Sequence, residues 1–275
     1  MVIIMSSNNP NSSLNNLPTN RKSQLKYLIK YRWKSLLIMG GVLLLFAIPL
    51  LVSLLLKDLK AISIVTNSSD GDELTTLFIN DIFYAVFVIP STIILFLGLA
   101  GIYRVIRNYI WGEGVIFGSD FFLGIKQNWK HFVINGLVSA TLFYGVYLAT
   151  AYIDVPFIKY LPLAFAILFL FPAILVHMNL TVIYKNNYFV QFRNAFVIYV
   201  RRFYIYLPLF LLAVAIPVVF MIFTIPLLVK YIVLFVFIYL FIPFYVLSIS
   251  VYSMHEFDEM INKDRHPELY KKGLF

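Results

Sequence analysis

The sequence predicts an all-α protein, a polytopic transmembrane helical bundle of six spans with cytoplasmic interfacial helices. Composition, six long apolar runs and the distribution of Lys and Arg predict this class. Hydrophobic residues make up 61% of the 275 residues and charged residues only 13%, whereas a soluble domain carries about a quarter charged residues. We therefore expect the apolar surface of this chain to be buried in lipid.

Six apolar runs each have about the 20 residues that a helix needs to cross the hydrocarbon core of a bilayer. They lie near residues 36–56, 82–106, 132–153, 160–183, 203–229 and 231–252. Residues 57–81 form the one long connection expected on the outer side, and the Asn/Ser-rich start of the chain is typical of disorder. The predicted organisation is a disordered tail at 1–23, a six-span membrane domain at 24–257 and a cytoplasmic tail at 258–275.

The distribution of Lys and Arg predicts the orientation, because both accumulate on the cytoplasmic side of membrane spans. One side of a six-span chain receives six cations before the first span and four each in the second connection, the fourth connection and the C-terminal tail. The other side receives Lys57, Lys60, Lys159 and Lys230. Eighteen cations against four predict that both termini are cytoplasmic. Anionic lipid then accounts for the net charge of +9, and no nucleic-acid partner is expected.

Basic, aromatic segments precede the first, third and fifth spans, at residues 24–36, 119–132 and 188–203. Each is predicted to be an interfacial helix leading into its span. In the second segment Lys126 and Lys130 lie four residues apart, on the side facing water. Two interpretations stay open: a threefold repeat of interfacial helix and hairpin, or the common enrichment of aromatic and cationic anchors at membrane boundaries.

The connection after the second span interrupts an otherwise apolar chain with the sequence Trp-Gly-Glu-Gly. Gly112 and Gly114 favour a turn there, and Ser119 or Asp120 is expected to cap the following helix. Glu113 and Asp120 could also act as an acid and a base. Without a nucleophile or an indicated pocket, roles in the turn and the cap are favoured, and we expect no catalytic residue.

One polar group lies inside a predicted span, at His177, Asn179 and Thr181. Polar residues within membrane helices are candidates for a functional site, and His177 and Thr181 share a helix face. The competing interpretation is a neutral histidine bonded to a neighbouring helix. Asn135 and Ser139 in the third span are interpreted as interhelical contacts.

Several chemical classes are excluded or disfavoured by missing motifs. The chain has no cysteine, which excludes disulfides and thiol catalysis. The C-terminal HEFDEMINKDRH does not match the metalloprotease pattern His-Glu-x-x-His, and no phosphate-binding Gly-Lys-Ser/Thr loop occurs. The sequence therefore predicts no metal, no cofactor and no enzymatic activity.

Two segments carry a resemblance to a known family. They are Trp111-Gly112-Glu113 with the following Ser119-Asp120-Phe121-Phe122 and Lys126-Gln127-Asn128-Trp129-Lys130, and the C-terminal Pro267-Glu268-Leu269-Tyr270 with Lys272-Gly273-Leu274. They resemble the bacterial YesL family (DUF624). The resemblance implies a cell membrane protein of a Gram-positive-type bacterium, often encoded beside carbohydrate uptake systems, and it implies no catalytic residue. The chain departs from the family pattern at Gly114 and near His131.

The leading functional prediction is an accessory or regulatory protein of unknown biochemical activity that serves a carbohydrate uptake system. Its partners would be the lipid bilayer and a carbohydrate ABC transporter permease, contacted through the cytoplasmic face. The predicted docking or family-motif residues are Gly112, Glu113, Asp120, Phe121, Lys126, Asn128, Lys130, Pro267, Glu268, Tyr270 and Gly273. The alternative is a small-solute transporter with His177 and Asn179 lining the path. A lipid-modifying enzyme built on Arg104, Arg107 and Glu113 is the least favoured class.

Overall fold

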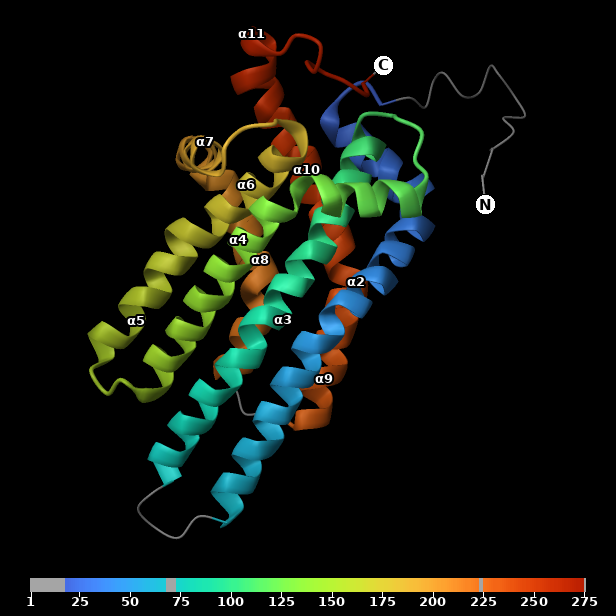
Figure 1. Ribbon diagram of the computed structural model, residues 1–275. Helices are drawn as coiled ribbons and strands as arrows, with labels where there is room; N and C mark the ends of the chain where they lie inside the picture. The colour runs from blue at the N-terminus through green and yellow to red at the C-terminus, as the bar shows by residue number, and fades with distance from the viewer. Residues whose placement is uncertain (1–17, 68–72, 223–224, 275) are drawn as a thin grey trace.

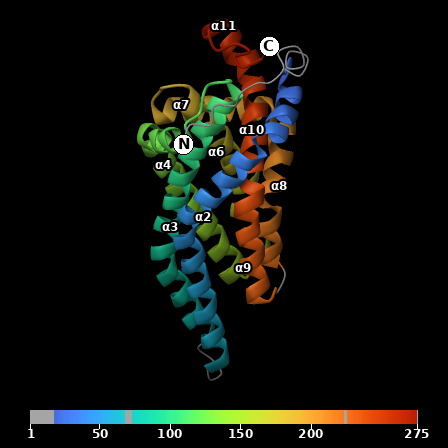
Figure 2. The ribbon, with the colours of Figure 1, turned by 90° about the vertical axis from the view of Figure 1, so that its right-hand side faces the viewer.

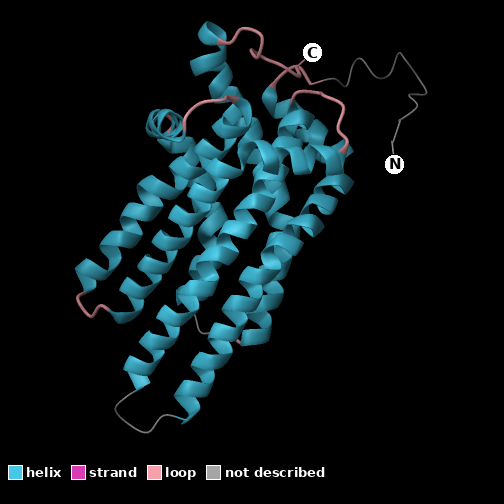
Figure 3. Cartoon of the chain, viewed as in Figure 1, coloured by secondary structure: helices cyan, strands magenta, loops and turns pink. Residues whose placement is uncertain are grey.

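The chain has the predicted all-α fold. The structure, a computed structural model, describes residues 18–67, 73–222 and 225–274. Over these ranges the chain forms helices and turns and contains no strand (Figures 1 and 3). The elements are α2 (Arg21–Asn67), α3 (Glu73–Ile110), α4 (Phe117–Tyr152), α5 (Pro156–Phe165), η2 (Ala166–Leu170), α6 (Phe171–Ile183), α7 (Tyr188–Arg201), α8 (Phe203–Ile222), α9 (Leu227–Val236), η3 (Phe237–Phe241), α10 (Ile242–Phe257), η4 (Asp258–Asn262) and α11 (Lys263–Arg265).

Five of these helical rods are long and apolar enough to cross a membrane. They are α2, α3, α4, the rod from α5 to α6 and the rod from α9 to α11. A sixth span arises if α7 and the first part of α8, which are bent by 102°, count as one unit. Large apolar side chains cover the outside of these rods, such as Leu45 at 65% and Phe157 at 78% exposure. Lipid accommodates such a surface and water does not, so the chain is a multi-pass membrane protein.

One of the three predicted interfacial helices is a separate element. Residues 24–36 belong to α2 and residues 119–132 to α4, so these two predicted helices run into their spans as parts of one continuous helix. No Pro or capping break separates either segment from its span. The third segment is α7, which begins after Asn187, whose side chain accepts a hydrogen bond from the Phe189 amide at 3.2 Å. A bend at Arg202 then separates α7 from α8.

The predicted outer loop at residues 57–81 is largely helical, and that prediction is corrected. α2 extends to Asn67 and α3 begins at Glu73, while residues 68–72 lie outside the described ranges. The α2–α3 hairpin reaches beyond the end of α9 in both views (Figures 1 and 2). Lys57 and Asp81 face each other inside this hairpin, with 3.2 Å between Nζ and Oδ1. From the sequence these two charged residues are expected in a loop, but in the structure they form an ion pair.

The fifth and sixth predicted spans also have different boundaries. α8 ends at Ile222, and α9 begins at Leu227 after Pro226, which fixes the backbone at the start of the helix. Lys230 therefore lies in the first turn of α9, near one end of this rod. It pairs with Asp58 of α2.

A proline within the fourth rod links that rod to α7. Pro172 lacks an N–H and cannot donate to the carbonyl of Leu168, four residues earlier, and the π-helical turn η2 lies just before it. The Leu168 carbonyl accepts a hydrogen bond from the hydroxyl of Tyr199 in α7. The carbonyl that the proline leaves without a helical donor thus helps to hold α7 against the bundle.

Small residues allow α3 and α4 to approach each other closely. A Cβ atom on Gly124 would lie 2.9 Å from the Ala100 carbonyl oxygen and 3.0 Å from the Gly101 Cα. Helices in membranes associate through such close contacts, because lipid provides no hydrophobic drive between them. The main core continues inward through α2, α3, α6 and α10, where Met39, Val176 and Ile249 are fully buried. It stabilises the end of the bundle at which the sequence motifs lie.

Candidate functional site

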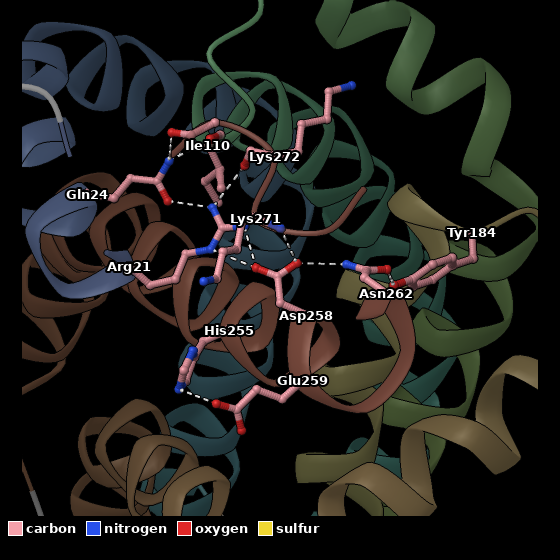
Figure 4. A network of polar contacts seen from close by, with 11 residues as sticks. Arg21, Gln24, Ile110, Tyr184, His255, Asp258, Glu259, Asn262, Lys271 and Lys272 are labelled. Atoms are coloured by element: carbon pink, nitrogen blue, oxygen red, sulfur yellow. Dashed lines mark hydrogen bonds and ion pairs between the residues drawn. The ribbon is translucent and has the colours of Figure 1, made fainter. Parts of the chain in front are cut away.

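A buried ion pair joins the start of the first helix to the end of the last span. Arg21 Nη2 lies 2.6 Å from Asp258 Oδ2, and both side chains are over nine-tenths buried. The other carboxylate oxygen accepts from Asn262 Nδ2 at 2.9 Å and from the Lys271 amide at 3.2 Å (Figure 4). A buried charge is tolerated when its partners satisfy it this fully. α2 thus begins three residues before the predicted boundary of the membrane domain, and the segment after Phe257 is packed.

Side chains from α2 also bind main-chain carbonyls of two distant segments. Gln24 donates to the Ile110 carbonyl at 2.7 Å and to the Gly273 carbonyl at 2.9 Å, and Arg21 donates to the Lys272 carbonyl at 3.1 Å (Figure 4). These carbonyls lie at helix and chain ends, where no helical N–H reaches them. The N-terminal turn of α2 therefore holds the end of α3 and the C-terminal segment together.

The polar network continues to Tyr184, which follows α6. Its hydroxyl donates to Asn262 Oδ1 at 2.5 Å. Burial raises the pKa of Tyr184, and the charge of Asp258 raises it further, so the hydroxyl stays protonated and remains a donor. Four segments that are distant in sequence thus meet in one network at this end of the bundle.

The predicted Trp-Gly-Glu turn ends α3. Gly112 has φ +69°, its N–H bonds the Tyr109 carbonyl at 3.2 Å, and the Glu113 N–H bonds the Asn108 carbonyl at 3.0 Å. This pair of bonds is a Schellman motif, which requires a left-handed residue that glycine supplies most easily. The sequence interpretation of Gly112 is therefore confirmed, whereas Gly114 borders open space and has ordinary φ.

The two sequence motifs that lie about 150 residues apart contact each other. Lys272 Nζ lies 2.8 Å from Glu113 Oε1 and 4.1 Å from the centre of the Trp111 ring. Gly273 has φ +81°, and a Cβ atom there would lie 2.0 Å from the Ile110 carbonyl oxygen. The connection after α3 and the C-terminal segment thus form one packed surface.

Asp120 and Phe121 have structural roles. The helix begins at Phe117, so the prediction that Ser119 or Asp120 is the capping residue is corrected: Asp120 acts from the first turn. Its Oδ2 accepts from the Ile116 N–H at 2.9 Å and its Oδ1 from Asn108 at 3.1 Å. Phe121 is 2% exposed and packs edge-on against Phe46. Glu113 is bound to Lys272 and Asp120 to Ile116 and Asn108, so both residues take part in structural contacts.

The remaining predicted docking residues lie at the surface of the same end. Lys126, Lys130, Pro267, Glu268 and Tyr270 are exposed. Asn128 is half-buried and donates to the Gly124 carbonyl of its own helix at 3.0 Å. The predicted set therefore divides into residues that build the surface and residues that remain available on it.

A second polar cluster surrounds His177 under α7. His177 Nδ1 lies within 3.1 Å of the Asn135 side-chain amide, and its ring stacks on that of His131 at 5.7 Å. Tyr188 donates to Asn135 at 3.0 Å. Thr181 donates to Gln191 at 3.1 Å. The described residues offer no hydrogen-bond partner to the buried Nε2 of His177, which makes this the strongest candidate for ligand or proton chemistry inside a span.

The predicted trio of His177, Asn179 and Thr181 is not a single site. Asn179 donates to the Leu175 carbonyl of its own helix at 3.1 Å, because residues two apart point to different sides of a helix. Sequence reasoning also missed His131, Tyr188 and Gln191, which come from α4 and α7. Their polar character was visible, but their convergence depends on helix packing.

A third cluster lies at the opposite end and was not predicted. The Asp81 carboxylate accepts from Lys57, from the Tyr147 hydroxyl at 2.9 Å and from the Tyr152 hydroxyl at 2.7 Å. The Tyr144 hydroxyl donates to its carbonyl. One buried acid thus joins α2, α3 and α4, which indicates a structural role.

The described residues include no group of three His, Asp or Glu side chains placed to hold a metal ion. Comparison with known proteins finds no matching family model, no matching curated protein and no matching solved structure.

Proposed function

We propose that this chain is a member of the YesL family in the bacterial cell membrane, with both termini in the cytoplasm. In this proposal it performs no catalysis and acts as an accessory or regulatory protein of a carbohydrate uptake system. It docks on a transporter permease of the ABC class through its basic end.

The observation that carries the docking proposal is the contact between the two sequence motifs. Lys272 joins Glu113 and Trp111, and Gly273 packs on the end of α3. These partly buried residues hold a surface on which Lys126, Lys130 and Tyr270 remain exposed. Exposed aromatic side chains beside cations on a rigid scaffold suit a protein interface, because they lose little conformational entropy on binding.

The test is co-purification from the native membrane. The wild-type protein, tagged and gently extracted, should carry a carbohydrate transporter permease in near-equal amount. The variant Lys126→Ala/Lys130→Ala/Tyr270→Ala should lose most of that partner, because it removes exposed groups and leaves the buried network intact. Lys60→Ala, an exposed cation at the opposite end, is the matched control and should retain the partner.

Two outcomes contradict the docking proposal. One is a wild-type protein that purifies without any membrane partner. The other is a triple variant that retains the permease at the wild-type ratio.

A second candidate function, small-solute transport, is favoured by one specific observation. His177 is fully buried, and its Nε2 has no partner among the described residues, while two neighbouring helices, α4 and α7, direct polar groups toward its ring. Transport predicts solute flux in liposomes that contain only this protein, and loss of flux in His177→Ala. Asn179→Ala is the matched control, because Asn179 bonds only within its own helix. Flux that survives His177→Ala would contradict this candidate.

A further inference from the structure

A groove of about 460 Å³ separates α7 from the last turns of the final rod. Arg193 and Arg201 of α7 line one side, and Arg265 of α11 lines the other. Leu180, Ile198 and Met260 form its apolar portion. The groove lies at the end of the bundle where α7 and α11 are seen together (Figure 1).

The three arginines have no ion-pair or hydrogen-bond partner in the part of the chain that the structure describes. Arg202, next to Arg201 in the sequence, contrasts with them because it pairs with Glu256 at 2.6 Å and with Glu259 at 3.2 Å. Asp264 is the one acid among the lining residues, and His266 is already beside Glu268 at 3.2 Å. The groove therefore has an excess of uncompensated positive charge.

The three faces of α7, which borders the groove, suit a helix that lies at a membrane boundary. One face, with Gln191, Ala195 and Tyr199, is buried against the bundle. A second face carries Phe189, at 80% exposure, and Phe196. At 100° per residue, Asn194 and Arg201 lie on a third face. A helix bent by 102° from the span that follows it, with one protein face, one apolar face and one polar face, suits the interface between hydrocarbon and water.

We propose that this groove binds the phosphate of an anionic glycerophospholipid. Guanidinium groups form paired, charge-assisted hydrogen bonds with phosphate oxygens, and Arg193, Arg201 and Arg265 border one groove. Leu180, Ile198 and Met260 then contact the glycerol and the first acyl methylenes. Basic pockets between membrane helices on the cytoplasmic side are known to hold anionic headgroups. The site uses none of the proposed docking residues Lys126, Lys130 and Tyr270, so it does not depend on the docking proposal.

Native mass spectrometry of the full chain in detergent, titrated separately with phosphatidylglycerol and with phosphatidylcholine, tests the proposal. We expect the first phosphatidylglycerol to bind at least about tenfold more tightly than phosphatidylcholine. Arg193→Gln/Arg201→Gln/Arg265→Gln should remove that preference, because it takes away the charge-assisted bonds to the phosphate. Lys126→Gln/Lys130→Gln/Lys263→Gln removes the same charge outside the groove and should keep the preference.

Three outcomes overturn the proposal. They are equal binding of the two lipids, an unchanged preference in the arginine variant, and full displacement of phosphatidylglycerol by inorganic phosphate, which would assign the groove to a soluble anion. The single variant Arg201→Gln, at an exposed position, keeps the test decisive if the triple variant does not fold. It should weaken phosphatidylglycerol binding several-fold.

Discussion

At the scale of single residues, Gly273 determines whether the C-terminal segment can pack. Its φ of +81° lies in the left-handed region, and a Cβ atom would overlap the Ile110 carbonyl oxygen at 2.0 Å. We expect Gly273→Ala to destabilise this contact by about 1–3 kcal/mol, because backbone strain and overlap act together. Trypsin should then cleave after Lys271 and Lys272 several times faster in detergent solution, as followed by mass spectrometry.

Gly114→Ala is the matched control for this prediction. Gly114 lies in the other motif and has ordinary φ, and a Cβ atom there would meet nothing within 4 Å. Digestion of this variant should proceed at the wild-type rate. Wild-type digestion of Gly273→Ala would contradict the packing of the C-terminal segment on α3.

The buried ion pair makes a second prediction at this scale. Asp258→Asn removes the charge that compensates Arg21 and leaves the guanidinium buried at 7% exposure. Loss of one partner from a buried pair costs about 3–5 kcal/mol, so the melting midpoint in detergent should fall by several degrees. Glu268→Gln, at an exposed position, should change the midpoint little. Arg21→Met/Asp258→Leu should recover part of the loss, and a midpoint unchanged in Asp258→Asn would contradict the burial of this pair.

At the scale of elements, the sequence predicted the apolar runs better than their ends. The run at residues 160–183 ends where α6 ends, because the following connection is polar and Asn187 caps α7. The segments at 24–36 and 119–132 have the same basic, aromatic composition as α7. They are parts of α2 and α4, and no break separates them from the rest of these helices. Composition was therefore the same in all three segments, and only the Asn187 cap and the bend at Arg202 distinguished a separate helix.

The absence of cysteine allows the orientation of α7 to be measured with single-cysteine variants. Phe196 and Asn194 are both exposed but lie about 160° apart around the helix. In membranes, we expect a charged maleimide to label Asn194→Cys at least about tenfold faster than Phe196→Cys, because lipid excludes charge. Ala195→Cys, at a buried position, is the control and should stay unlabelled. Equal labelling of Phe196→Cys and Asn194→Cys would place α7 in water and not at the membrane.

At the scale of the whole molecule, what sequence reasoning missed depends on contacts between helices. His177 and Thr181 were predicted from one helix, but His131 and Gln191 join them only through the packing of α4 and α7. From the sequence, Lys57 and Asp81 were expected to be loop residues. Their pairing depends on how α2 aligns against α3, which the sequence does not show. The motif residues were found from resemblance, whereas the contact between Lys272 and Glu113 became visible only in three dimensions.

The arrangement of charge over the whole molecule leads to the last prediction, the orientation in the membrane. At the end opposite the motifs, Lys57 and Lys230 are each neutralised by an aspartate of the α2–α3 hairpin, whereas the motif end keeps exposed cations on α4, α7 and α11. Lys and Arg near the ends of spans are retained in the cytoplasm during insertion, and most of them lie at the motif end, so we expect this end to be cytoplasmic. Asn67→Cys, at the outer hairpin, should react with an impermeant maleimide in intact cells. Asn186→Cys, between α6 and α7, should react only after the membrane is permeabilised, and the wild-type chain, which has no cysteine, should give the background. The reverse pattern would invert the orientation and would move both the docking surface and the lipid groove to the outer leaflet.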